Sequence, residues 1–166
     1  MARDEAAAVR AAQRGSASGI EALFRLHWAR AHRAAYLVVH DAAAAEDIAQ
    51  EAFVAALRHL DRFDRRRPFG PWLHRIVVNR AIDWARARQL RAEAELGEAA
   101  APAAGPELGG SLLSALAALP PDHRAVIVLR HLLGYTPGEI AQLLELPRGT
   151  VNSRLRRGLD SLRERV

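Results

Sequence analysis

The stretch from Gly134 to Arg165, GYTPGEIAQLLELPRGTVNSRLRRGLDSLRER, constrains the fold of this chain more than any other segment. Thr136 is a good helix N-cap, and Pro137 suits the first helical position, where a missing N–H costs nothing. Apolar residues then recur at helical spacing until Pro147 interrupts the pattern. The segment therefore predicts two short helices joined by a tight turn.

The second of these helices combines an apolar stripe with a basic and polar face. Arg and Asn side chains can pair bidentately with base edges in a DNA major groove, and Arg and Ser also reach phosphates. The alternative is a plain packing unit whose basic face is only solvated. Because the cap, the proline and the basic second helix agree in order, we interpret the segment as a DNA-binding helix-turn-helix. Its candidate DNA-binding residues are Arg148, Thr150, Asn152, Ser153, Arg156 and Arg157.

Charge divides the chain into three segments. The net charge is +5, and all 24 basic residues are Arg. Residues 1–90 carry 15 Arg and 10 acids, and residues 112–166 carry 8 Arg and 5 acids. Residues 91–111 carry one Arg and four Glu in a context rich in Ala, Pro and Gly, without a periodic apolar face. The pattern predicts two compact domains, 1–90 and 112–166, joined by a flexible acidic linker, 91–111.

The N-terminal domain shows helical periodicity and no convincing strand. Phe24 and Leu26 belong to the apolar face expected for its first helix, and Asp41 is a candidate N-cap for the next. Helices are expected over Ile20–Val39, Ala42–Leu60 and Pro71–Arg88. The sequence therefore predicts an all-α fold, with an N-terminal helical bundle and a C-terminal helix-turn-helix domain.

Four side chains on the second expected helix form an acidic face: Glu46, Asp47, Gln50 and Glu51. Acids near a helix N-terminus are stabilised by the helix dipole alone, which is a sufficient structural explanation. The functional alternative is that an acidic face inside a basic domain marks a surface for a basic protein partner.

The segment 61–72 mixes turn formers with four Arg and three aromatic residues. Such a mixture suits single-stranded nucleic acid, because bases stack on aromatic rings while Arg follows the phosphates. For Phe63 and Trp72 we favour the alternative, that the rings are core anchors. Three consecutive Arg, 65–67, are too costly to bury, so the loop 64–69 is harder to explain as core.

Taken together, these segments resemble the extracytoplasmic-function (ECF) group of bacterial RNA polymerase sigma factors. Residues 41–53, DAAAAEDIAQEAF, are close to the AEDxxQExF signature of region 2.2. Residues 67–86, RPFGPWLHRIVVNRAIDWAR, are similar to regions 2.3 and 2.4. Residues 119–141, LPPDHRAVIVLRHLLGYTPGEIA, precede the recognition helix as in region 4. The family implies a two-domain initiation factor that binds core polymerase, opens promoter DNA and reads the −10 and −35 elements.

The resemblance assigns roles to particular residues. It implies that the acidic face docks on the clamp helices of the polymerase β′ subunit, and that the recognition helix reads the −35 element. It implies that the −10 element is bound and melted by Arg65, Arg66, Arg67, Phe69, Trp72, Arg75, Asn79 and Arg80. The implied partners are core RNA polymerase, through the β′ clamp helices and the β subunit, promoter DNA and, as a candidate, an anti-sigma factor.

Three positions depart from the family pattern, one of them Ala44, which replaces a commonly acidic position before the AED motif. The family often has Arg or Lys where this chain has Asn152, so the −35 preference is not transferred. Gly158 stands where a small helix former is usual, so we expect a looser end to the recognition helix.

Two other classes of function explain the sequence less well. An ordinary helix-turn-helix regulator explains the C-terminal motif but neither the acidic helix nor the Arg-rich loop. An enzyme is disfavoured, because no metal-ligand spacing and no glycine-rich phosphate loop occurs. We therefore expect no catalytic residues, no metal and no cofactor.

The sequence also bears on the compartment. It has no cysteine, no long apolar run and no apolar signal core in its first residues, MARDEAAAVRAAQRG. We therefore expect a cytoplasmic protein without membrane insertion.

Overall fold

The computed structural model describes residues 2–96 and 111–166. The described residues form helices and no strand, which confirms the all-α fold. In chain order the elements are α1 (Ala2–Gln13), α2 (Ala17–Val39), α3 (Ala42–Arg58), the 3-10 turn η1 (Leu60–Arg62), α4 (Phe69–Leu96), α5 (Ser111–Ala117), α6 (Pro121–Ile127), the π-helical turn η3 (Val128–Leu132), α7 (Pro137–Leu144) and α8 (Arg148–Arg165). Most of the expected linker, residues 97–110, lies outside the described residues.

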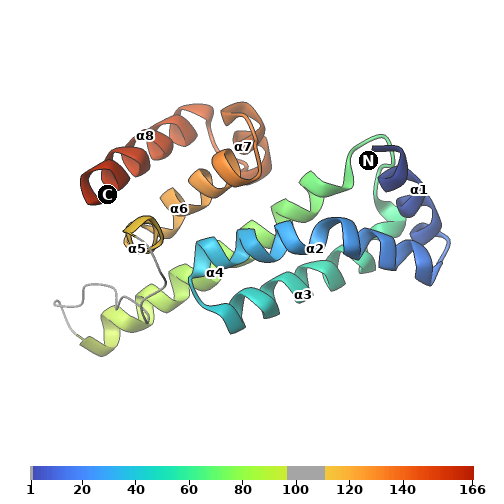
Figure 1. The fold of residues 1–166 in the computed structure, drawn as a ribbon, viewed down its shortest axis with the longest axis horizontal. Coiled ribbons are helices and arrows are strands. Elements are labelled where there is room, and N and C mark those ends of the chain that lie inside the picture. The colour runs from blue at the N-terminus through green and yellow to red at the C-terminus, as the bar shows by residue number, and fades with distance from the viewer. Residues whose placement is uncertain (1, 97–110) are drawn as a thin grey trace.

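The N-terminal domain is a bundle in which α2, α3 and α4 lie side by side, with α1 packed on α2 at one end (Figure 1). Asp41 caps α3 as expected, because its Oδ1 accepts a hydrogen bond from the Ala44 N–H at 3.0 Å. Many buried positions of α2 and α3 are alanines, including Ala34, Ala35 and Ala52, and these small side chains let the helices approach closely.

The C-terminal domain is built from α5 to α8, and α7 and α8 form the expected helix-turn-helix (Figure 1). Thr136 begins α7 with a capping box, in which its Oγ1 accepts from the Glu139 N–H and the Glu139 carboxylate accepts from the Thr136 N–H. Glu145 ends α7 in the left-handed conformation, with φ of 55°. Pro147 then stands as the N-cap of α8, which confirms the predicted break between the two helices at this residue.

The two domains pack against each other. Arg124 of α6 is 8% exposed and donates hydrogen bonds to the Leu119 carbonyl, at 2.9 Å, and to the Val38 carbonyl at the end of α2. Burial lowers the pKa of Arg124 to about 10, so the guanidinium stays charged at neutral pH. On η3, the Leu132 carbonyl accepts a hydrogen bond from Arg30 of α2 at 3.3 Å.

The structure differs from the sequence prediction at both ends of the N-terminal domain. No helix was expected before Ile20, yet α1 is present and buries Ala8, Val9 and Ala12. At the other end α4 continues to Leu96, so the first residues of the expected linker are helical. Residues 91–96 alternate Ala with charged or long side chains, which are good helix formers even without an apolar face.

Two residues expected on the apolar face of α2 are in fact exposed. Phe24 is 42% exposed and Leu26 is 39% exposed. The ring of Phe24 stacks on Trp28 of the same helix, with centroids 4.7 Å apart, and lies 5.2 Å from the Phe53 ring. The apolar face expected for α2 was therefore broader than the face that is buried.

Candidate polymerase and nucleic-acid interfaces

The acidic face of α3 is exposed along its whole length. Glu46, Asp47, Gln50 and Glu51 all face solvent, because the residues between them, Ile48 and Ala49, are buried in the core. Within the face, Gln50 donates a hydrogen bond to Glu46 at 3.3 Å. The structure therefore brings all four predicted residues together on one surface.

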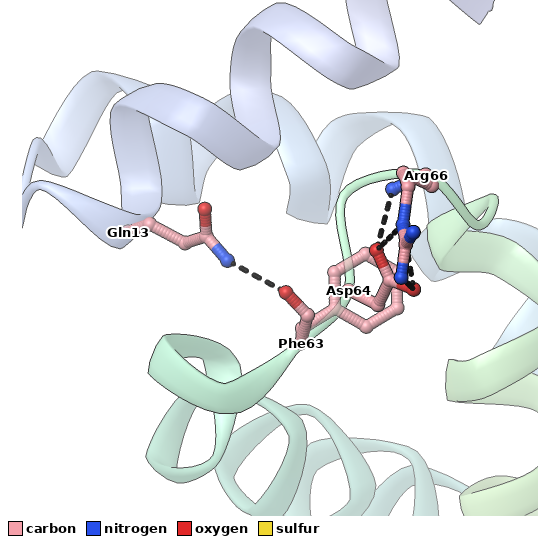
Figure 2. Close-up of polar contacts among 4 residues, drawn as sticks. All are labelled: Gln13, Phe63, Asp64 and Arg66. Atoms are coloured by element: carbon pink, nitrogen blue, oxygen red, sulfur yellow. Dashed lines mark hydrogen bonds and ion pairs between the residues drawn. The ribbon is translucent and has the colours of Figure 1, made fainter.

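The Arg-rich loop between η1 and α4 is also exposed, at Arg65, Arg66 and Arg67. Its shape is set locally by Asp64, whose carboxylate accepts hydrogen bonds from the Arg66 N–H and Nε, both at 3.0 Å (Figure 2). The hydrogen bond from the Arg66 side chain, followed by the one from the Arg66 N–H, lowers the pKa of Asp64 to about 2. The Arg67 N–H closes the turn on the Asp64 carbonyl at 3.0 Å.

Aromatic rings anchor both ends of this loop. The Phe63 ring lies 4.8 Å from the Trp72 ring and 5.8 Å from the Phe69 ring. Phe63 is buried and Trp72 is half-buried against the core, which confirms that these rings are core anchors. The resemblance implied that Phe69 contacts the −10 strand. Its ring is fully buried, however, and is not available on the surface for such a contact. Phe69 is the first residue of α4, and its ring packs against the His27 ring of α2, with centroids 5.2 Å apart.

The remaining predicted −10 residues lie on α4, and two of them are paired with acids. Arg75 forms an ion pair with Glu145, in the turn of the helix-turn-helix. Arg80 forms one with Glu51 at 3.0 Å, so the acidic face of α3 adjoins the basic side of α4. Asn79 is half-buried. These ion pairs are at least two-fifths exposed, so they stabilise little and are readily exchanged for another anion.

The recognition helix α8 presents its predicted residues outward. Arg148, Asn152, Arg156 and Arg157 are exposed and Thr150 and Ser153 are half-buried, whereas Val151, Leu155 and Leu162 are buried. Gly158 does not loosen this helix, which continues to Arg165. A Cβ at Gly158 would lie 2.6 Å from Ile127 Cδ1, so the glycine lets α8 approach α6 closely.

Sequence reasoning missed a set of contacts that α1 makes with the Arg-rich loop. Gln13 donates hydrogen bonds to the carbonyls of Leu60 and Phe63, and Glu5 accepts one from the Phe69 N–H. The one available signal was the spacing of Glu5 and Gln13, which places them two turns apart on the same side of a helix.

Residues 2–96 and 111–166 contain no group of three His, Cys, Asp or Glu side chains that could hold a metal ion. His74 is buried and His40 is half-buried, and desolvation by this burial lowers the pKa of each to about 4. None of the helices formed by the described residues has the length and apolar character of a membrane span.

Comparison with known proteins accounts for both domains. Residues 23–91 match the Sigma-70 region 2 family, and residues 110–162 match the Sigma-70, region 4 family. The chain is 34% identical to the ECF RNA polymerase sigma factor SigW of Bacillus subtilis, over 77% of this chain and 76% of SigW. The chain belongs to the ECF group of RNA polymerase sigma factors. It is also 34% identical to the RNA polymerase sigma factor CarQ of Myxococcus xanthus, over 90% of each protein.

Solved structures of sigma factors have a similar fold. CnrH, in complex with the cytosolic domain of CnrY, is 26% identical, with a TM-score of 0.66 over 97% of this sigma factor and 96% of CnrH. RpoE of Bartonella quintana, in complex with the anti-sigma factor NepR, is 24% identical, with a TM-score of 0.70 over 87% of this chain and 94% of RpoE. Helix α1 lies outside the region 2 match, so this family pattern does not account for it.

Proposed function

We propose that this sigma factor directs core RNA polymerase to promoters by binding the polymerase and two DNA elements at once. The observation that carries the proposal is the presence, on one chain, of region 2 with an exposed acidic face and region 4 with an outward-facing recognition helix. In this proposal residues 1–90 form the domain for polymerase and the −10 element, and residues 112–166 form the −35 domain. Residues 91–111 are the connector, and the protein works in the cytoplasm, where core polymerase is found.

The acidic face of α3 is the proposed polymerase contact. Its four side chains are exposed, so they can meet the β′ clamp helices without rearrangement of the helix. Opposite charges across such an interface steer association and set its register. The pairing of Glu51 with Arg80 means that polymerase binding and the basic side of α4 are electrostatically linked.

The Arg-rich loop and α4 are the proposed −10 site. Arg65, Arg66 and Arg67 offer exposed guanidinium groups to the phosphates, and the half-buried Trp72 offers part of a ring beside them. Because the Phe69 ring is fully buried, we assign it the role of anchoring the loop. Arg75 and Asn79 continue the site along α4, once Glu145 has given way to DNA.

The exposed side of α8 is the proposed −35 site. Asn152 and Arg156 are one turn apart on that side, where they can meet base edges in a major groove. Arg148 and Arg157, also exposed, are assigned to phosphates, with Thr150 and Ser153 at the margin. CnrH is similar to this chain and was solved with the cytosolic domain of CnrY, and RpoE of Bartonella quintana was solved with the anti-sigma factor NepR, so we include an anti-sigma factor among the proposed partners.

Run-off transcription with core polymerase tests the proposal. The expected result is a specific start site on fragments of its own genome when the sigma factor is added, and none without it. Absence of a specific start with demonstrably folded protein would overturn it. The same assay separates the main alternative, because a helix-turn-helix regulator would bind its site tightly and specifically without polymerase, whereas a sigma factor needs the holoenzyme.

A further inference from the structure

Helix α1 reaches both ends of the Arg-rich loop. From α1, Gln13 Nε2 donates a hydrogen bond to the Leu60 carbonyl at 2.9 Å. It also donates one to the Phe63 carbonyl at 3.1 Å, just before the loop (Figure 2). Two turns earlier on the same helix, Glu5 Oε2 accepts a hydrogen bond from the Phe69 N–H at 3.3 Å, just after the loop. The five residues between these anchors, 64–68, belong to no helix.

Two of these contacts hold backbone groups next to the loop, the Phe63 carbonyl and the Phe69 N–H, whereas the Leu60 carbonyl also accepts a hydrogen bond from the Phe63 N–H. The Phe69 N–H is at the start of α4, where the first N–H groups have no acceptor within the helix, and a carboxylate is favoured there by the helix dipole. Glu5 is held in place in turn, since its Oε1 lies 2.8 Å from His27 Nε2. Its side chain is only 20% exposed, and that of His27 13%, so water competes weakly with these contacts.

Helix α1 is itself seated firmly on α2. Ala8, Val9 and Ala12 are buried in the core of the N-terminal domain. At the crossing point α2 has Gly19, where a Cβ would lie 2.5 Å from the Ala12 backbone nitrogen. The close approach therefore requires glycine, and it fixes the position from which Glu5 and Gln13 reach the loop.

We propose that α1 acts as a brace for the Arg-rich loop. In this proposal Gln13 and Glu5 are positioning residues, which hold the loop in the shape that binds single-stranded −10 DNA. The inference rests on the proposed function of the loop. A loop that binds a strand gains affinity and base discrimination when its backbone is held in the bound shape beforehand. Here the aromatic rings hold the loop from the core side, and α1 holds its two backbone ends.

The test measures binding of a fluorescent single-stranded −10 oligonucleotide, taken from the mapped promoter, to reconstituted holoenzyme. Gln13→Met keeps the length of the side chain and removes both donated hydrogen bonds. We expect it to weaken −10 binding by about tenfold, the equivalent of about one net hydrogen bond. We also expect a smaller affinity ratio between this strand and one with a single −10 base replaced. Co-purification with core polymerase and binding to a −35 duplex should not change. Ala7→Met, on the exposed side of α1, is the matched control and should bind as the wild type does.

A second pair of variants tests Glu5 by conservative rescue. Glu5→Ala removes the acceptor for the Phe69 N–H and should weaken −10 binding, whereas Glu5→Gln keeps an acceptor oxygen and should restore most of it. Equal −10 binding by Glu5→Ala and Glu5→Gln would show that the hydrogen bond from the Phe69 N–H to Glu5 does not position the loop.

The exposed loop variant Arg67→Ala separates failure of the brace from failure of the proposed function. If Arg67→Ala weakens −10 binding while Gln13→Met and Glu5→Ala leave affinity and base discrimination unchanged, the brace is refuted and the −10 role of the loop stands. If Arg67→Ala also has no effect, the loop does not bind the −10 strand, and the brace is refuted together with that role.

Discussion

Acidification should weaken the fold of this sigma factor through one histidine at the junction of its two domains. His74 of α4 is 5% exposed, and its Nδ1 lies 2.7 Å from the Tyr135 hydroxyl of the C-terminal domain. Burial lowers the pKa of His74 to about 4, and repulsion from Arg30 and from His27 in its protonated form acts in the same direction. The imidazole is therefore neutral in the folded protein at neutral pH.

The direction and size of the effect follow from the two pKa values. In the unfolded chain the imidazole takes up a proton near its ordinary pKa of 6.5, whereas the folded protein resists protonation down to about 4. The stability contributed by the neutral imidazole is complete above 6.5 and is lost as the pH falls toward 4. At about 1.4 kcal/mol per pH unit, the loss reaches about 2 kcal/mol near pH 5 and about 3 kcal/mol near pH 4.

Replacing His74 by Gln keeps a polar partner for Tyr135 and removes the titration. We expect the free energy of unfolding, measured by urea denaturation at about pH 7.5 and about pH 5, to fall about 2 kcal/mol less in His74→Gln than in the wild type. Tyr135→Phe is the control, because it removes the hydroxyl and should cost about 1 kcal/mol at neutral pH while leaving the acid sensitivity in place. Equal acid sensitivity in wild type and His74→Gln would refute the reasoning.

Three further substitutions test packing and the proposed interfaces. Gly158→Ala should lower the free energy of unfolding by about 1 kcal/mol, because crowding of the new methyl group against Ile127 outweighs the gain in helix propensity. In a double-mutant cycle, Ile127→Val should relieve this crowding, so the loss caused by Gly158→Ala should be smaller in the Ile127→Val background. Strictly additive losses would contradict the crowding explanation. Asp47→Arg should abolish co-purification with core polymerase while leaving −35 duplex binding intact. Co-purification at the wild-type level would show that Asp47 serves only to stabilise the helix. Asn152→Arg should change the sequence selected from a randomised −35 library, whereas Arg157→Ala should weaken binding at every sequence and reduce the salt slope by about one. If instead Arg157→Ala changes the selected sequence and Asn152→Arg does not, Arg157 reads the bases and Asn152 does not.

Local patterns were enough to predict much of this protein. The caps at Thr136 and Asp41, the turn at Pro147 and the exposed acidic face were all readable from the chain, because each depends on residues within one or two helical turns. The all-α fold and the ECF resemblance followed from the order of such segments. Helical periodicity also predicted which side of α8 is buried, at Val151 and Leu155.

Tertiary contacts decided what periodicity alone could not predict. Phe69 looked like a surface aromatic beside three Arg, yet its ring is fully buried because α1, α2 and α4 converge on it. Gly158 looked like a weak point of a helix, yet it is the point where α8 meets α6. In both cases the environment is made by residues distant in sequence, whose positions no local pattern encodes.

The bracing of the −10 loop and the contact between the domains depend on the same kind of information. Gln13 and Phe63 are 50 positions apart, and Arg124 and the Val38 carbonyl are 86 apart. The sequence by itself determined which segments are helical and which faces are polar, since those properties are local. Only the tertiary structure decided which polar group meets which backbone carbonyl, because that depends on how whole helices pack.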